Sequence, residues 1–506
     1  MGTFQLYLKS VGEVGYVESI RDVLIYANGL VGARIWEKVV FENDQVGVVN
    51  SISAELTEIL LFSEGGINLG TMVARTGETV KASFSNNSLG RVLDVFGNPL
   101  DGRGTIKGSK PRYLEAPAPP MIDRARINQN LETGVTVVDI LIPIGKGQRQ
   151  LVIGDQKTGK TGFLLQAIAR QAQLGTVCIY ALIGKRRNDL ASTIEKLKRF
   201  GVFQKTIIIA APAASLTSII YLAPFAALTC AEHFRDQGLD VLVVLDEITR
   251  HAKYFRELSN LSRKMPGRDG YPGDIFHLHA QLMERAGRFV VGEGSEHETL
   301  TLRIKGKTAA ITCLPVVETI GDDFTGYIQT NLMAMTDGHL FFDVNRFQQG
   351  VRPAVNIGLS VTRVGKQTQR TVERDVAARL RKIIFDYIKA QDVAKFGVEL
   401  LETTQQQLVI GQKLEAILEQ SVDVIIPRVV QLLFLSLLLS GFWQETTPVE
   451  IKLHKENILA AYKAGKIPKF FGELEVSLEM GSIKRFSTNI ETFRADLLAI
   501  CVPKKN

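Results

Sequence analysis

The sequence is poor in cysteine and has no long uninterrupted apolar run. Its four cysteines, Cys178, Cys230, Cys313 and Cys501, lie far apart without metal-ligand spacing, so we expect buried reduced thiols. The most apolar stretch, residues 431–443 (QLLFLSLLLSGFW), is too short to span a bilayer, which predicts a buried helix or a partner surface. Because no N-terminal segment resembles a secretory signal, we expect the chain by itself to be soluble.

The sequence also lacks a large excess of either positive or negative charge. The 506 residues carry a formal net charge of +7 and contain no long run of Lys or Arg. A nucleic-acid interface requires a clustered basic face, so no nucleic-acid partner is expected. With 45% hydrophobic and 22% charged residues, no internal repeat and no low-complexity segment, the chain has the composition of a globular protein of several domains.

Three successive patterns divide the chain. Residues 1–80 contain short β-branched segments separated by turns, which predicts a small closed β-barrel. Residues 81–363 alternate apolar strands with helices, which predicts a mainly parallel sheet covered by helices. In residues 364–506, apolar residues recur three and four positions apart, which predicts a helical bundle. The fold class is therefore multidomain α/β.

The segment LVIGDQKTGKT, which ends at Thr161, is the strongest functional signal. It matches a phosphate-binding loop, in which glycines let the backbone N–H groups point at a polyphosphate. Lys160 can reach the terminal phosphates, and the Thr161 hydroxyl is placed to ligate magnesium. An apolar strand precedes the loop and helical spacing follows it, as the motif requires. The residues expected to bind a nucleoside polyphosphate are Gly154, Asp155, Gln156, Lys157, Thr158, Gly159, Lys160 and Thr161.

A second nucleotide signal follows the apolar segment 241–245 (VLVVL). The next residue, Asp246, is expected to hold Mg²⁺ through water, because a carboxylate at the end of a buried strand is a suitable acceptor. A solvent-facing acid without a metal is the alternative. Hydrolysis also needs a group that orients or deprotonates water. The segment 176–184 (TVCIYALIG) is instead followed by Lys185, a cation that cannot take a proton from water.

Three further features each have two interpretations. His277 and His279 suit one face of a strand and a metal, but without a third ligand nearby a structural pair is favoured. Residues 266–274 (PGRDGYPGD) predict a loop, either a surface connector or a contact for a moving partner. Arg363, in the turn 358–365, is by its surroundings a surface charge or a salt-bridge partner.

Taken together, these segments resemble the alpha-subunit family of F-type ATP synthases, the non-catalytic nucleotide-binding subunits of a hexameric head. The resemblance extends from about Phe4 to about Leu439. It is carried by SLGRVLDVFGNPLDG, PIGKGQRQLVIGDQKTGKT, VLVVLDEITRHAKYFRELSNLSRKMPGRDGYPGDIFHLHAQLMERAGRF and GVRPAVNIGLSVTRVG. It implies an N-terminal β-barrel, a central RecA-like P-loop nucleotide-binding domain and a C-terminal helical domain.

The resemblance also implies roles for single residues. Arg363 would be an arginine finger, supplied in trans to the adjacent catalytic beta site to stabilise the transferring phosphoryl group. Phe347, Arg352 and Pro353 would line the adenine pocket. Lys185 stands where the beta subunit has a water-activating glutamate and alpha usually has glutamine, which argues further against hydrolysis in this chain's own site.

Near the nucleotide the match to the family is partial. Lys157 stands where the family usually has glutamine, with Gln156 one place earlier. Of the C-terminal glutamines expected near the adenine, Gln420 fits one, and Val422 stands where another is expected.

Three segments depart from the family. The helix that docks on the peripheral stalk is expected to be missing, since the chain begins almost at the barrel. Residues 290–312 are longer than expected and predict an added hairpin, and the end after Gly441 fits the pattern poorly. By the resemblance, these three segments lie on connections to the stalks and to neighbouring subunits, and not at the nucleotide site.

The function implied is that of a regulatory subunit that binds Mg-ATP or Mg-ADP. It would alternate with beta subunits in a ring of six around the gamma shaft and contact the delta subunit or peripheral stalk. The complex would make ATP from ADP and phosphate using a transmembrane proton or sodium gradient. It would lie peripherally on the cytoplasmic side of a bacterial plasma membrane, attached through the membrane sector, or in an organelle-encoded equivalent.

Three alternatives stay open at this point. An F-like rotary ATPase would have the same ring with another mechanical output, as the missing N-terminal helix suggests. A Rho-like hexameric RNA translocase would carry exposed aromatics in its barrel, which are not obvious here. A homohexameric export ATPase is disfavoured, like the translocase, because Lys185 replaces the expected base.

Overall fold

The computed structural model describes residues 3–63, 65–291, 307–395 and 401–501. The chain divides into two compact units that interleave along the sequence. The first unit contains residues 1–126, 147–156 and 172–337, and the second contains residues 127–146, 157–171 and 338–506. The predicted domain boundaries at residues 80 and 363 stay predictions.

The first unit begins with a closed antiparallel barrel, which confirms the expected N-terminal architecture. Alternate side chains point inward, and Ile25, Val39, Phe41 and Ile59 are fully buried in its core. The strands, in the order β1-β2-β5-β4-β3-β6, are β1 (Val14–Arg21), β2 (Leu24–Asn28), β3 (Glu37–Phe41), β4 (Val46–Ile52), β5 (Thr57–Leu61) and β6 (Met72–Thr79).

A short helix, α1 (Thr3–Val11), precedes the barrel. Phe4 is buried against Val40 and Ala74, which point away from the barrel core. The sequence does not predict this helix, because nine residues are too few to show a repeated apolar spacing.

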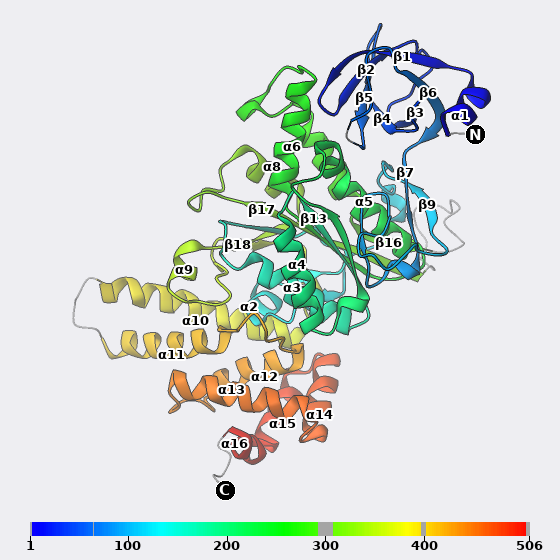
Figure 1. Ribbon diagram of the computed structural model, residues 1–506. Helices are drawn as coiled ribbons and strands as arrows, with labels where there is room; N and C mark the ends of the chain where they lie inside the picture. The colour runs from blue at the N-terminus through cyan, green and yellow to red at the C-terminus, as the bar shows by residue number, and fades with distance from the viewer. Residues whose placement is uncertain (1–2, 64, 292–306, 396–400, 502–506) are drawn as a thin grey trace. The chain divides into compact units, whose positions relative to one another are not determined.

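A mainly parallel sheet forms the centre of the first unit, as the sequence predicts (Figure 1). Its strands are runs of Val, Ile and Leu that are buried on both faces, the usual pattern of parallel strands covered by helices. The parallel strands, in the order β12-β17-β15-β13-β14-β8, are β8 (Val92–Leu93), β12 (Leu151–Gly154), β13 (Val177–Ile183), β14 (Thr206–Ala211), β15 (Val241–Asp246) and β17 (Lys307–Glu318).

The predicted added hairpin concerns strand β16 (Gly287–Val291), which pairs antiparallel with β17. Val291 lies opposite Lys307 in this pairing. The connecting residues 292–306, on which the rest of that prediction falls, lie outside the described residues. A second antiparallel pair joins β7 (Lys81–Phe84) to β9 (Lys110–Tyr113).

The helices described in this unit beside the sheet are α4 (Arg187–Arg199), α5 (Thr217–Arg235), α6 (Ile248–Leu261), α7 (Ile275–Glu284) and α8 (Tyr327–Met335). Helix α5 packs on β13, β14 and β15, and α6 packs on β13 and β17. Residues 266–274 form a loop with one short 3-10 turn, as predicted. His277 and His279 lie in helix α7, so the expectation that they share a strand is wrong.

The second unit is mainly helical. The apolar stretch after Pro427 forms α12, in which four of the six leucines are buried, and this confirms the prediction of a buried helix. The helices are α2 (Thr136–Leu141), most of α3 (Lys160–Gln173), α9 (Val344–Gln348), α10 (Thr371–Lys395), α11 (Glu402–Leu418), α12 (Arg428–Leu439), α13 (Pro448–Lys463), α14 (Pro468–Glu479), α15 (Ile483–Thr492) and α16 (Arg494–Cys501).

Two antiparallel strand pairs belong to the same unit, β10 (Asn130–Leu131) with β11 (Ile144–Gly145) and β18 (Gly338–Phe342) with β19 (Val361–Thr362). All four cysteines are buried free thiols, as expected from their spacing. Within the described ranges, no helix is both long and apolar enough to cross a membrane.

Candidate functional site

Strand β12, the phosphate loop and helix α3 follow one another directly along the chain. The strand ends at Gly154 and the helix begins at Lys160, so the loop leads into a helix N-terminus, where the helix dipole favours an anion. Gly159 has φ 97° and Lys157 has φ 62°, values of the left-handed region that let the backbone curl. This is the local geometry that a bound polyphosphate requires.

The first residues of the loop are held by the segment that follows β17. The Asp155 carboxylate accepts hydrogen bonds from the backbone N–H of Gly321 at 2.7 Å and from the Thr319 hydroxyl at 2.5 Å. Gln156 Nε2 donates to Glu318 Oε2 at 2.9 Å. Neighbouring parallel strands thus fix the start of the loop, since Gly154 pairs with Glu318.

The carboxylate of Asp246, at the end of β15, is only 1% exposed and already has partners. Lys185 Nζ donates to Asp246 Oδ2 at 2.5 Å, and the hydroxyl of Tyr180 donates to the same oxygen. Because β13 and β15 run parallel, with Leu182 opposite Asp246, the end of one strand brings Lys185 to the end of the other. The sequence predicts roles for Lys185 and Asp246 separately but not their ion pair.

Two further acids, Glu247 and Glu318, lie at this end of the sheet. Burial raises the pKa of Glu247 to about 8, and a hydrogen bond with Glu318 and the nearby charge of Asp246 act in the same direction. Arg250, in the first turn of α6, has its Nε 3.6 Å from Glu247 Oε2. Sequence reasoning missed this pair, although Glu247 directly follows the buried strand β15 and Glu318 ends β17.

Phe347 and Arg352 lie beside the phosphate loop within the second unit. The guanidinium of Arg352 lies over the Phe347 ring, and its Nη1 donates to the carbonyl oxygen of Phe347 at 2.7 Å. A Cβ atom added at Gly159 would be 3.8 Å from the same ring, an ordinary contact distance. Pro353 follows directly in the chain. The structure therefore brings Phe347 to the loop and Arg352 onto its ring, while the role of all three residues in an adenine pocket stays a prediction.

Gln420 is occupied by contacts within the protein. Its Oε1 accepts from the backbone N–H of Thr136 at 3.1 Å, and its Nε2 donates to the Gly134 carbonyl at 2.6 Å. Val422 packs on the first turn of α3, where a Cβ added at Gly162 would be 2.8 Å from its Cγ1. Gln420 therefore fixes the chain around α2 through both polar atoms of its amide.

Arg363 is exposed and follows β19 directly. The Thr362 hydroxyl donates to the Pro143 carbonyl at 2.9 Å. Gly365 fits so closely that an added Cβ would be 1.6 Å from the same oxygen. The turn that carries Arg363 is thus anchored on both sides of the residue.

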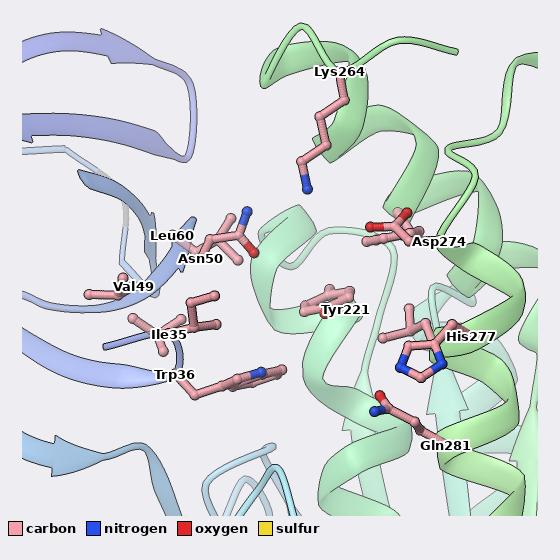
Figure 2. A pocket seen from close by; sticks show the side chains of 13 residues that line it. Ile35, Trp36, Val49, Asn50, Leu60, Tyr221, Lys264, Asp274, His277 and Gln281 are labelled. Atoms are coloured by element: carbon pink, nitrogen blue, oxygen red, sulfur yellow. The ribbon is translucent and has the colours of Figure 1, made fainter. Parts of the chain in front are cut away.

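The two histidines of helix α7 do not form a pair with each other. His279 is buried, with its Nε2 3.1 Å from Nδ1 of His251. His277 instead lines a cavity of about 140 Å³ beside Trp36 and Tyr221 (Figure 2). Over the part of the chain that the structure describes, no group of three or more His, Cys, Asp or Glu could hold a metal ion. The cavity contains none of the residues predicted to bind nucleotide.

Strand β12 of the mainly parallel sheet leads through a phosphate loop into helix α3. This arrangement defines the chain as a P-loop nucleotide-binding protein. The model of the ATP synthase alpha/beta family, nucleotide-binding domain, matches residues 134–362, and that of the C-terminal domain of the ATP synthase alpha/beta chain matches residues 369–493. The chain belongs to the ATP synthase alpha/beta family. The second match continues past Gly441, so the expectation that the end of the chain leaves the family pattern is wrong.

Curated relatives are similar over most of the chain. ATP synthase subunit alpha of Neorickettsia sennetsu is 35% identical over 460 residues, which cover 89% of this chain and 88% of the relative. The subunit of Caldanaerobacter subterraneus subsp. tengcongensis is 38% identical over 409 residues, 81% and 78% of the two chains. That of Dictyoglomus turgidum is 37% identical over 441 residues, 87% and 84%. These comparisons confirm the resemblance found in the sequence and give no support to the RNA-translocase alternative.

Proposed function

We propose that this chain is a non-catalytic, alpha-type subunit of an ATP synthase head. It binds ATP or ADP at residues 154–161, with the base beside Phe347, Arg352 and Pro353. It alternates with beta subunits around a gamma shaft and contacts the delta subunit or peripheral stalk. The complex makes ATP from ADP and phosphate with a transmembrane proton or sodium gradient, on the cytoplasmic side of a bacterial plasma membrane.

The observation that carries the non-catalytic role is the pairing of Lys185 with Asp246 at 2.5 Å. An ammonium group has no acceptor and cannot take a proton from an attacking water. Burial and the neighbouring Glu318 raise the pKa of Glu247, the next acid in the chain, which favours its protonated form. Lys185 therefore cannot supply the general base that hydrolysis needs.

The catalytic contribution proposed for this chain is Arg363, supplied to a neighbouring subunit. Two observations support this proposal. Arg363 is exposed, and it lies on a turn that the contacts of Thr362 and Gly365 hold in place. Phe385 and Ile388 of α10 are 58% and 50% exposed and line the same hollow as Thr362, an apolar surface suited to another protein. A guanidinium held there can stabilise charge on the transferring phosphoryl oxygens of the neighbour.

Reconstitution of the head with an Arg363→Ala variant tests this function. Steady-state ATP turnover is expected to fall by about 10³-fold or more, because the finger acts on the transition state, while this chain still binds nucleotide. Arg374→Ala, at another exposed arginine of the same unit, is the matched control and should leave turnover unchanged. Unchanged turnover with Arg363→Ala would remove the finger, and vigorous hydrolysis by the purified chain alone would overturn the non-catalytic role.

A further inference from the structure

The surroundings of Asp246 fit a magnesium ion poorly. Water-mediated binding needs a carboxylate with negative charge to share with the metal's waters. Here the ammonium of Lys185, at 2.5 Å from Oδ2, already balances that charge, and Tyr180 donates to the same oxygen. The ammonium of Lys185 has no lone pair with which to ligate a cation, and the Tyr180 hydroxyl uses its proton to occupy the oxygen that a metal-bound water would need.

The next acid in the chain offers no substitute. Glu247 is 1% exposed, with its Oε2 3.6 Å from Arg250 Nε, and it shares a hydrogen bond with Glu318. A divalent ion placed beside Asp246 would meet the positive charge of Lys185 at close range, where like charges repel strongly in a buried setting.

We propose that the Lys185 ammonium takes the place of the divalent cation at Asp246, so that this chain binds ATP or ADP with little dependence on Mg²⁺. The inference rests on the proposed function, since it concerns the same nucleotide site. A bound metal is often the largest local charge in a phosphate site, and a lysine provides part of that charge permanently. Water-mediated magnesium binding by Asp246 and the Thr161 hydroxyl stays the competing prediction.

The test is the ATP dissociation constant of the purified full-length protein, measured calorimetrically in excess Mg²⁺ and in EDTA. For the wild-type protein the two constants are expected to agree within about twofold. In Lys185→Gln, which removes the positive charge but keeps a polar side chain, Mg²⁺ should tighten ATP binding about tenfold, a typical coupling between two ligands.

Three variants identify the cause of this change. Lys185→Arg keeps the positive charge and should stay independent of Mg²⁺. Arg187→Gln makes the same charge change two residues away, at an exposed side chain, and should behave as the wild type does. In the double variant Lys185→Gln/Asp246→Asn the acceptor is also removed, so the Mg²⁺ dependence should disappear again.

The outcomes separate the two proposals. Wild-type protein that binds ATP in neither condition refutes the proposed nucleotide function. Wild-type protein that binds ATP about tenfold more tightly with Mg²⁺ leaves that function intact and overturns the role of Lys185. Because Lys185→Gln leaves Asp246 buried without a cation, its fold is checked by circular dichroism. If it fails to fold, the wild-type and Lys185→Arg measurements decide.

Discussion

The guanidinium carbon of Arg352 lies 3.5 Å from the centroid of the Phe347 ring. Arg352 also donates to the carbonyl oxygens of Phe347 at 2.7 Å and of Val351 at 2.8 Å, so one side chain holds both the ring and the end of α9. Such cation–π contacts contribute about 0.5–2 kcal/mol. The ring is thereby fixed in place next to Gly159 of the phosphate loop.

Replacing this ring should weaken nucleotide binding. Phe347→Ala is expected to raise the ATP dissociation constant of the protein about tenfold, because stacking of a base on an aromatic ring is worth about 1–3 kcal/mol. Titration calorimetry measures the change, and Phe385→Ala, at an exposed ring of α10 away from the loop, serves as the control. Equal affinities in both variants would show that Phe347 does not contact the base.

The stability of the first unit depends on a buried ion pair. Arg285 Nε and Nη2 are each 2.8 Å from an oxygen of Glu232, and both side chains are almost fully buried. Arg285→Met is expected to lower the free energy of unfolding by about 3–5 kcal/mol, because Glu232 would stay buried without a partner.

Urea unfolding of this unit can be followed by the fluorescence of Trp36, which packs on Tyr221 and Phe225. A Trp443→Phe background removes the other tryptophan. The control is Arg199→Met, whose exposed partner Glu195 lies 3.9 Å away and should contribute less than about 1 kcal/mol. Comparable losses in the two variants would contradict a special role for the buried pair.

The sequence predicts those features of this protein that are formed by consecutive residues. The phosphate loop is contiguous, and its flanking strand and helix are recognisable from apolar spacing alone. The apolar runs of β13, β14 and β15 predict buried parallel strands because no polar face interrupts them. The family resemblance then supplied the candidate roles of Arg363 and Phe347.

Contacts between residues that are far apart in the sequence could not be predicted. Lys185 and Asp246 are 61 residues apart, and only the parallel register of β13 and β15 makes them partners. The segment FHLHA alternates apolar residues and histidines over five positions, too few to distinguish a strand from the first turns of α7. The true partner of His279 lies on another helix, so no spacing within the segment reveals it.

The buried histidines predict a loss of stability in mild acid. His251 Nε2 is 3.0 Å from the Tyr221 carbonyl, which can only accept, so Nδ1 is left to accept from Nε2–H of His279. Burial lowers the pKa of His251 from 6.5 to about 4, and burial also lowers the pKa of His279. Below pH 6.5 the unfolded chain therefore binds protons that the folded chain does not.

The free energy of unfolding should consequently fall as pH drops from 6.5 to 4, with His251 alone accounting for about 3 kcal/mol. Above pH 6.5 this contribution is fully present. Urea unfolding at a series of pH values measures the slope, which should be smaller in His251→Gln/His279→Gln. His277→Gln, a change at the cavity-lining histidine of the same helix, should keep the wild-type slope. Identical slopes in all three proteins would exclude the pair as the cause.

The turn that carries Arg363 should tolerate no side chain at Gly365. A Cβ there would lie 1.6 Å from the Pro143 carbonyl oxygen and 2.6 Å from the Thr362 hydroxyl, so the backbone itself must move. If Arg363 is the finger, Gly365→Ala should reduce ATP turnover of the reconstituted head about 100-fold, the usual effect of a misplaced catalytic group. ATP binding by this subunit should persist.

Gly358→Ala is the matched control for this displacement. The nearest atom to its new Cβ is the Asn356 Oδ1 at 3.5 Å, an ordinary contact, so turnover should stay near that of the wild type. Combining Gly365→Ala with Arg363→Ala should add little further loss, because a displaced finger and an absent one remove the same interaction. If the two losses instead multiply, Gly365 acts by some route other than the placement of Arg363.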